Sequence, residues 1–585
     1  MNIYALKGWL PVAAIASLVT LPSCIDDNYD LSDIDTTVEL QIKDLVLPIN
    51  IDPITLGTIL DIDTDDEESR IKVIDGQYVM TETGSFVSDN IRINPISIGR
   101  QYIAPINEHI SIGGNYSAGR AALASFQLPP YLQNFSYSYD PVDECIKNME
   151  EVKTDFTIGM TISLSDPSGA IKSMQLHDFT LLLPPGLTGT PDKGSYDPAS
   201  GHVSLGSVTP VNNRVIFSMP VSAIDMASTA AKFDNINRRF SFGSSIGIQG
   251  GSIDITELNA GAAIPQYVEL NITFDLSELE VLSFTGTFDY SIDGFAIDPI
   301  ELNDLPDILT QPQTHIALEN PQIYLHLENP LARYRVCART GMTITPYRDD
   351  TPGTPCSLDK GSFTIGDEAK MQQPSYIPPV DYNFCLSPKA PTTAVDGFPA
   401  PEHIYYTSLG DLLWGDGLPT SLDVNFDNPE IKDQRAVDFR IGEDFTVSGN
   451  YLLYAPLAFK DNSTIVYTKT EDGWGDDELD AVTITTLQVS TTVTSTLPLG
   501  VKLSGYPIDA DGNRIENVEI TATDIPANAQ RQPVIIRISG AIHNLDGITF
   551  TAECSAGSST ALSPDQTLTL DNIRATVSGH YTKEL

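Results

Sequence analysis

Alternation of apolar and polar residues with a period of two is the pattern that most constrains the fold. Thr37–Ile51 ("TVELQIKDLVLPINI") and Val534–Ile542 ("VIIRISGAI") alternate or run apolar and are rich in β-branched residues, as strands are. Arg70–Met80 carries Asp75-Gly76 between two β-prone arms, which is typical of a hairpin turn. The 40 Pro and 41 Gly argue against long helices. We therefore predict a mainly β fold of serial antiparallel β-sandwich domains with a few short connecting helices.

Three short segments are the predicted helices. In Asp143–Val152, the apolar residues Ile146, Met149 and Val152 recur every third position, which indicates one face of a helix. We expect each helix to connect strands and to pack on a sheet. The other two segments are Ser222–Phe233 and Ser408–Trp414.

Pro-rich, loop-like stretches near residues 130, 300–312 and 390–402 predict where the chain divides. The predicted parts are, in order, a signal peptide (1–23), a lipidated acidic tether (24–36), an N-terminal β domain (37–130), a β-sandwich domain (131–305), a β region with a cysteine cluster and Pro-rich loops (306–400) and a C-terminal β-sandwich domain (401–585).

Weak internal repetition accompanies this division. The stretch "TVSGNY" at Thr446–Tyr451 recurs as "TVSGHY" at Thr576–Tyr581, and "FTGTFDY" at Phe284–Tyr290 is a looser relative. Such repetition favours an array of related sandwiches over a single catalytic barrel.

The N-terminal segment has the organisation of an export signal. Lys7 precedes the apolar stretch Leu10–Leu21, which has the length of a signal-peptide core and is too short to span a bilayer. The motif "LPSC", which ends at Cys24, then resembles the lipobox of bacterial lipoproteins. This resemblance implies thioether diacylation of Cys24, cleavage before it and acylation of the new amine by a chain such as palmitate. A stable anchor needs more than one chain. An ordinary secretory signal with a chance cysteine is the alternative.

An acidic run follows Cys24 directly. Asp26 and Asp27 open it, and no basic residue lies between Cys24 and Lys43. The run resembles the acidic export tag of Bacteroidota-type surface-exposed outer-membrane lipoproteins. That resemblance implies a protein lipid-anchored in the outer membrane and facing the cell exterior. A self-repelling, extended linker is the alternative, and both descriptions can hold together.

The net charge bounds the partners. The 78 Asp and Glu against 33 Lys and Arg give a formal charge of −45. So negative a surface opposes nucleic acid, whose phosphates need cationic contacts, and favours neutral glycans, cationic partners or divalent ions. Past Cys24 no apolar run is long enough for a transmembrane helix, so we expect the lipid on Cys24 to be the membrane contact.

Export makes disulfides permissible for the cysteines that follow Cys24. We expect two of the clustered Cys337, Cys356 and Cys385 to be able to staple the Pro/Gly-rich loop between them. The odd number of remaining cysteines leaves at least one free thiol, and the sequence does not give the pairing.

Catalytic and metal motifs are weak in this chain. Gly243–Gly247 fits G-x-S-x-G, but its surroundings predict strand running into strand, where a nucleophile elbow needs strand–turn–helix. The eight His are scattered, and no two lie three or four residues apart. We therefore predict no catalytic residue, no metal site and no cofactor, with structural calcium at an acidic loop such as Asp61–Ser69 as the alternative. An extracellular glycosidase is the enzymatic alternative, because its carboxylate pair could come from any of the 78 acidic residues.

Two tryptophans stand in acidic turns. Trp414 is followed by Gly415-Asp416, and Trp474 is followed by Gly475-Asp476. A flat apolar ring beside carboxylate acceptors suits a neutral sugar, whereas the alternative has each ring folded back onto a sheet. The candidate glycan platform therefore comprises Tyr405, Tyr406, Trp414, Asp416, Trp474 and Asp476.

These features together predict a surface-anchored, non-enzymatic lipoprotein that displays β-sandwich domains for binding or assembly at the cell exterior. One alternative is a neutral-glycan-binding accessory of an outer-membrane uptake system, with an outer-membrane protein as partner. Another is a fimbrial or adhesive subunit, which would complete its fold by strand exchange. The fimbrial alternative predicts a removable terminal strand, and residues 570–585 are its candidate.

Overall fold

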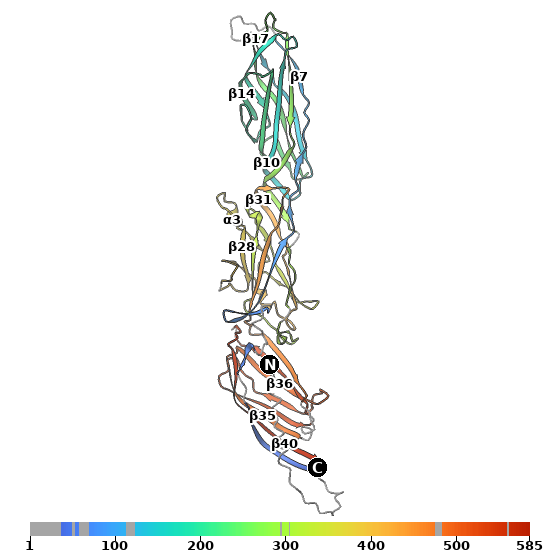
Figure 1. The fold of residues 1–585 in the computed structure, drawn as a ribbon, viewed down its shortest axis with the longest axis vertical. Helices are drawn as coiled ribbons and strands as arrows, with labels where there is room; N and C mark the ends of the chain where they lie inside the picture. Colours follow the sequence, from blue (N-terminus) through green and yellow to red (C-terminus); the bar gives the residue numbers. More distant parts are fainter. Residues whose placement is uncertain are drawn as a thin grey trace, which may run out of the picture.

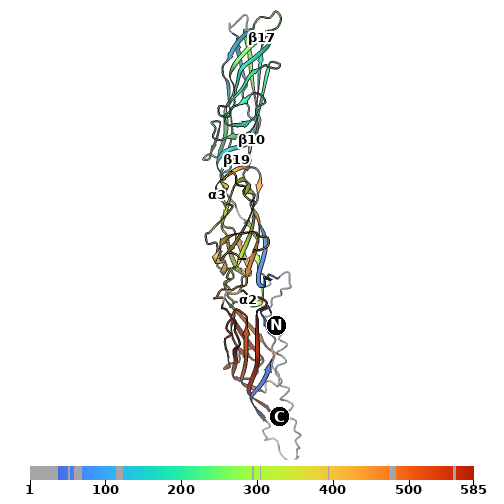
Figure 2. The same ribbon diagram turned by 90° about the vertical axis from the view of Figure 1, so that its left-hand side faces the viewer.

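The computed structural model describes residues 37–49, 53–57, 69–112, 123–292, 295–302, 305–392, 394–473, 482–543, 545–557 and 561–584. In this part the chain is mainly β, as predicted, and forms an elongated rod of three modules stacked end to end (Figure 1, Figure 2). We call them the proximal, middle and distal modules, in order of distance from Thr37. Among the described residues, the sheets are antiparallel apart from one parallel strand pair, β28–β29.

The proximal module is a sandwich of two sheets. Its larger sheet has the order β1 (Thr37–Ile49), β40 (Thr567–Glu584), β35 (Val482–Ser495), β38 (Gln532–Ile542) and β37 (Glu519–Ala522), with β2 (Ile54–Thr55) on β40. Its smaller sheet has the order β34 (Thr464–Glu471), β39 (Gly547–Ala556) and β36 (Leu499–Ile508).

The middle module also has two sheets and carries the short helical turns. One sheet has the order β20 (Phe295–Ala296), β4 (Gln77–Ser88), β33 (Ser448–Pro456), β22 (Gln322–Glu328), β28 (Asp381–Ser387) and β29 (Glu402–Tyr405), with β3 (Ile71–Ile74) on β4. The other has the order β21 (Ile300–Glu301), β30 (Ser421–Asn425), β24 (Thr343–Arg348) and β25 (Thr351–Pro352), with β26 (Cys356–Ser357) on β24. The short helical turns are α2 (Asp307–Thr310), η4 (Pro330–Tyr334), α3 (Glu368–Met371) and η5 (Thr407–Asp411).

The distal module contributes most of the largest sheet, which continues into the middle module. That sheet has the order β12 (Leu187–Gly189), β15 (Arg214–Asp225), β10 (Ile146–Ser165), β19 (Leu279–Ser291), β31 (Glu430–Arg440), β23 (Ala338–Thr340) and β27 (Phe363–Ile365), with β18 (Tyr267–Leu276), β7 (Ile106–Ser111) and β6 (Ile96–Ile98) off this path. The facing sheet has the order β13 (Ser195–Tyr196), β14 (His202–Val208), β11 (Ile171–Leu182), β17 (Arg239–Leu258) and β16 (Ala231–Asp234), with β8 (Ala124–Leu128) and β9 (Tyr131–Tyr139) on β17. A two-stranded ribbon, β5 (Ile91–Arg92) with β32 (Asp444–Phe445), lies beside the junction.

The chain path is nested. It begins in the proximal module, passes through the middle module, builds the distal module from residues 96–291 and then returns through the same two modules in reverse order. In each module an early strand pairs with a late one: Thr37 lies opposite Glu584, Val87 opposite Ser448 and Ile98 opposite Leu279. The strand that enters each module is therefore fixed by the strand that leaves it.

This path corrects the predicted division into consecutive domains. The predicted domain 37–130 contributes strands to all three modules, and the predicted domain 401–585 supplies strands to the middle and proximal modules. The predicted domain 131–305 matches most of the distal module. The Pro-rich stretches mark loops within this path, and pairing between strands from opposite ends of the chain leaves no local signal in composition.

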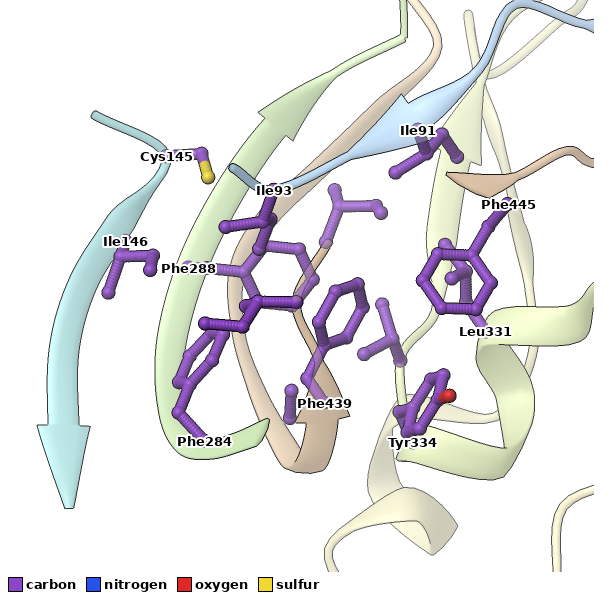
Figure 3. Packing of buried hydrophobic residues seen from close by; sticks show 14 of the residues in the cluster. Ile91, Ile93, Cys145, Ile146, Phe284, Phe288, Leu331, Tyr334, Phe439 and Phe445 are labelled. Carbon is purple, nitrogen blue, oxygen red and sulfur yellow. The ribbon is translucent and has the colours of Figure 1, made fainter. Parts of the chain in front are cut away.

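Aromatic packing joins the distal and middle modules. Strand β19 pairs with β31, and the Phe439 ring lies 6.0 Å from Phe284 and 5.0 Å from Phe288 across that pair. On its other side Phe439 lies 5.0 Å from Tyr334 and 5.5 Å from Phe445 in the middle module (Figure 3). One hydrophobic cluster extends through this junction and reaches Leu562 of the proximal region. The distal and middle modules are therefore held together by a shared sheet and a shared core, and the core alone continues into the proximal module.

Two of the three predicted helices are strands. Ile146, Met149 and Val152 lie on β10 and are all buried, because irregularities in the pairing of β10 with β19 fall between them. Each such bulge shifts the two-residue alternation by one, so a spacing of three faces the core. Residues 222–233 cover the end of β15, a turn and the start of β16, and Ser408–Trp414 overlaps the 3₁₀ turn η5.

The repeated glycines occupy similar positions in the three modules. A Cβ on Gly286, Gly449 or Gly579 would lie 2.1–2.3 Å from a carbonyl oxygen of a neighbouring strand. These glycines lie on β19, β33 and β40, the late strand of the distal, middle and proximal module respectively. The short sequence matches therefore coincide with a shared need for close strand approach.

Candidate functional site

The Trp414 loop lies near the end of the middle module that adjoins the proximal one. Trp414 is 41% exposed, and its ring centroid lies 5.7 Å from that of His315. The next residue is fixed from beneath: His315 Nδ1 contacts the Gly415 carbonyl oxygen at 2.7 Å, and a Cβ on Gly415 would lie 2.3 Å from Arg348 Cζ. Contacts with His315 and Arg348 therefore fix the loop that places the Trp414 ring at the surface.

Arg348 anchors the backbone of the same loop. Its Nε donates to the Gly417 carbonyl at 2.9 Å, and its guanidinium also donates to the Leu413 carbonyl at 3.2 Å. Burial lowers the pKa of Arg348 from its ordinary value, and nearby Asp416 opposes this shift. The Asp416 side chain is 85% exposed, so its carboxylate is available to a ligand at the surface.

The two tyrosines of the candidate platform face opposite ways. Tyr405 is 54% exposed, with its ring 4.5 Å from His403. Tyr406 is fully buried, and its hydroxyl donates to the Cys356 carbonyl at 2.7 Å. This burial raises the pKa of Tyr406. Because successive residues at a strand end point to opposite faces, only one of the two can meet a ligand, and Tyr406 does not belong to a surface platform.

Several predicted residues lie outside the described part of the chain. They are Cys24, Asp26, Asp27, Trp474 and Asp476. The acidic loop considered for calcium, Asp61–Ser69, lies outside it except for Ser69. Their predicted roles therefore stay predictions.

The clustered cysteines are free thiols in the structure, which corrects the expected staple. Cys337, Cys356 and Cys385 are all buried, and each packs in different surroundings. The Cys356 thiol donates to the Ser408 carbonyl at 3.1 Å, whereas Cys385 contacts the Ser387 hydroxyl. Burial raises the pKa of Cys337 and of Cys356 to about 11, so both favour the unreactive thiol form.

The G-x-S-x-G segment lies within strand β17, as the sequence context predicted. The Ser245 hydroxyl donates to Asn134 Oδ1 on the neighbouring strand at 2.8 Å. This position is not a turn before a helix, so the segment lacks the geometry of a nucleophile elbow.

A serine, a histidine and an aspartate lie close together on the distal-module sheet that contains β11, β14 and β17. His177 Nδ1 lies 3.0 Å from Ser207 Oγ, and His177 Nε2 lies 3.2 Å from Asp254 Oδ2. A hydrolytic triad has the opposite order, with serine at Nε2 and the carboxylate at Nδ1. The contacts therefore describe a surface hydrogen-bond network that orients three strands.

Three side chains with potential metal-ligand atoms lie together on the middle-module sheet, on strands β22 and β28. His326, Glu328 and Asp381 each offer one ligand atom, and these atoms all lie within 4.8 Å of one another. A surface depression of about 350 Å³ adjoins them, lined by His326, Glu328, Ser85, Val87, Ser448 and Asn450 among others. We call this group the His326 cluster.

Helical ligand spacings in the sequence do not reveal the His326 cluster. His326 and Glu328 are two residues apart, which in a strand places both on one face. Asp381 comes from the neighbouring strand β28, opposite Glu328. The first pair could have been found from a search at strand spacing, whereas the third member depends on the sheet register.

Comparisons with known proteins do not assign this chain to a family. No family model and no curated protein matches it. Among solved structures it is similar to a protein from Parabacteroides distasonis that is provisionally described as secreted, with 13% identity, a TM-score of 0.34, and coverage of 50% of this chain and 89% of the other. It is also similar to an archaeal virus protein with a triple jelly roll fold, with 8% identity, a TM-score of 0.09, and coverage of 83% and 91%. Likenesses this weak support no conclusion about function. Among the described residues, no helix has the length and apolarity needed to cross a membrane.

Proposed function

We propose that this protein is a non-enzymatic, surface-anchored rod that holds its distal module away from the membrane for binding or assembly outside the cell. The observation that carries the proposal is the nested chain path. Thr37, the first described residue, lies opposite Glu584 in the proximal module, whereas residues 96–291 form the distal module at the other end of the rod. A lipid on Cys24 would therefore tether one end and leave the other free.

Two further features support a display role. The distal and middle modules share a sheet, and one hydrophobic cluster extends from both into the proximal module; such a shared core resists bending more than a flexible linker would. The formal charge of −45 opposes adsorption to anionic lipid head groups, which keeps such a rod off the surface that anchors it.

Tag accessibility on intact cells tests the proposal. The type of turn at Val211–Asn213 suits insertion of an epitope, because Val211 is 73% exposed and Asn212 and Asn213 form a tight turn with positive φ. We expect antibody to bind this tag on unbroken cells, and Cys24→Ala to abolish palmitate labelling and cell retention. A tag reached only after lysis, or unchanged lipid labelling of Cys24→Ala, would contradict the proposal.

Glycan binding at the Trp414 loop is a second candidate function. The observation that favours it is the half-exposed Trp414 ring beside the exposed Asp416 carboxylate. Two results on a glycan array would support this function. Trp414→Ala would abolish binding by the full-length protein while Tyr405→Ala retains it, or both substitutions would reduce it. Absence of binding by the parent protein would remove it.

The fimbrial alternative receives no support from its candidate strand. Residues 570–584 belong to β40, which pairs with β1 on one side and with β35 on the other. Removing such a central strand would break two ladders. Within the described part of the chain, the edge strands of this sheet are β1 and β37.

A further inference from the structure

We propose that the His326 cluster is a binding site for a divalent transition-metal ion, with zinc as its reference ion. The ligands are His326 Nε2 and one carboxylate oxygen each from Glu328 and Asp381. This site is independent of the proposed display function.

Strand register builds the site. His326 and Glu328 lie two residues apart on β22, so both side chains leave the same face of the sheet. On the neighbouring strand β28, Asn383 lies opposite His326 and Asp381 lies opposite Glu328. Four polar side chains therefore form a square on one face without any loop.

Asn383 orients the imidazole for metal binding. His326 Nδ1 lies 3.0 Å from Asn383 Oδ1, an acceptor, so Nδ1 carries the proton and the Nε2 lone pair stays free. That free nitrogen lies 3.8 Å from Asp381 Oδ1. A histidine that donates its second ring nitrogen to an oxygen while the first faces carboxylates is the usual arrangement around a protein metal ion.

The two carboxylates need a counter-charge. Glu328 and Asp381 are directly opposed across the strand pair, and like charges in this position destabilise a sheet. Among the described residues, no Lys or Arg forms a salt bridge with either of them. A dication between them would turn this repulsion into attraction.

The geometry and the donor set fit zinc better than calcium. Ligand atoms lie roughly 2 Å from a zinc ion, so three atoms within 4.8 Å of one another can share one ion after small side-chain rotations. Both carboxylates are exposed. Calcium prefers six or more oxygen ligands and not imidazole. The depression beside His326 and Glu328 gives water or an oxygen of a bound molecule access to the fourth position.

Zinc titration of purified, chelator-treated full-length protein tests this site. Binding is measured by isothermal titration calorimetry in excess Mg²⁺. The Mg²⁺ occupies carboxylate-only positions and leaves the imidazole site to zinc. We expect one zinc ion per chain and binding at least about tenfold weaker in His326→Ala and in Asp381→Asn. Asn383→Leu, which removes the orienting acceptor, is expected to weaken binding roughly 10- to 100-fold while leaving all three ligands in place.

His109→Ala is the matched control. His109 is likewise a strand histidine beside a carboxylate, with its Nε2 3.7 Å from Glu269, but it is more exposed than His326 and is not part of the His326 cluster. We expect this variant to bind zinc like the parent. No zinc uptake by the parent, or equal uptake by the parent, His326→Ala and Asp381→Asn, would overturn the proposal and assign any binding to the general acidic surface.

Discussion

Phe439→Ala at the junction of the distal and middle modules is expected to weaken both modules together. Phe439 is fully buried, and truncation of a buried Phe costs about 3–5 kcal/mol of unfolding free energy. Two of its ring partners, Phe284 and Phe288, lie on β19 of the distal module. Aromatic pairs contribute roughly 0.5–1.5 kcal/mol each beyond burial, so about 1–3 kcal/mol of the loss is coupling between modules.

Hydrogen–deuterium exchange of the full-length protein measures this coupling module by module. We expect Phe439→Ala to raise exchange both in β10 and β19 and in β22 and β33. Phe384→Ala is the matched control, because Phe384 is equally buried but its ring contacts Phe363 within the middle module. Its effect should stay in the middle module. The reasoning is refuted if Phe439→Ala lowers stability by less than about 1 kcal/mol or affects one module alone.

Three further predictions concern strand approach, pH and thiols. Gly286→Ala should lower the unfolding free energy by about 1–3 kcal/mol in denaturant titrations, because its Cβ would lie 2.1 Å from the Asn148 carbonyl oxygen; Gly99→Ala, with open space around it, should have no effect, and equal stabilities would refute the argument. Hydrogen bonds from the Thr407 side chain and backbone lower the pKa of Asp359 below 3.8, so its stabilisation of η5 is present above that value and is lost as the pH falls through the lower, folded-state pKa. Unfolding measured from neutral to acid pH should show this loss in the parent and not in Asp359→Asn, and identical profiles would contradict it. Alkylation of unfolded, unreduced protein should label every described cysteine, because all of them are free thiols. A cysteine that is labelled only after reduction would show a disulfide and contradict this. The described cysteines are Cys145, Cys337, Cys356, Cys385 and Cys554.

Local patterns in the sequence predicted local structure well. The hairpin at Asp75-Gly76 is confirmed, with β3 and β4 on either side and positive φ at both residues, as a primed turn requires. Period-two alternation gave the fold class correctly. The helix predicted over Asp143–Val152 is wrong, because bulges in a strand change which residues face the core. The positions of these bulges depend on the partner strand and cannot be seen in the local sequence.

Long-range pairing was the part that the sequence could not supply. Nothing in Thr37–Ile49 indicates that its partner is the last strand of the chain, so the nested path was not predicted. The same limit applies to sites. The sequence left open whether Trp414 lies at the surface or folds back onto a sheet, and the structure leaves its ring 41% exposed. Tyr406 was wrongly included in the platform, because its hydroxyl is buried against the Met342 and Cys356 carbonyls, which are distant in sequence.

Electron microscopy of the full-length protein with labelled tags tests the nested rod most directly. One tag would be inserted at Asn212 in the distal module, and another would follow the C-terminus, beside the proximal strand β1. We predict an elongated particle with the two tags at opposite ends. Both tags at the same end, or a compact particle, would contradict the nested path and with it the proposed display of the distal module.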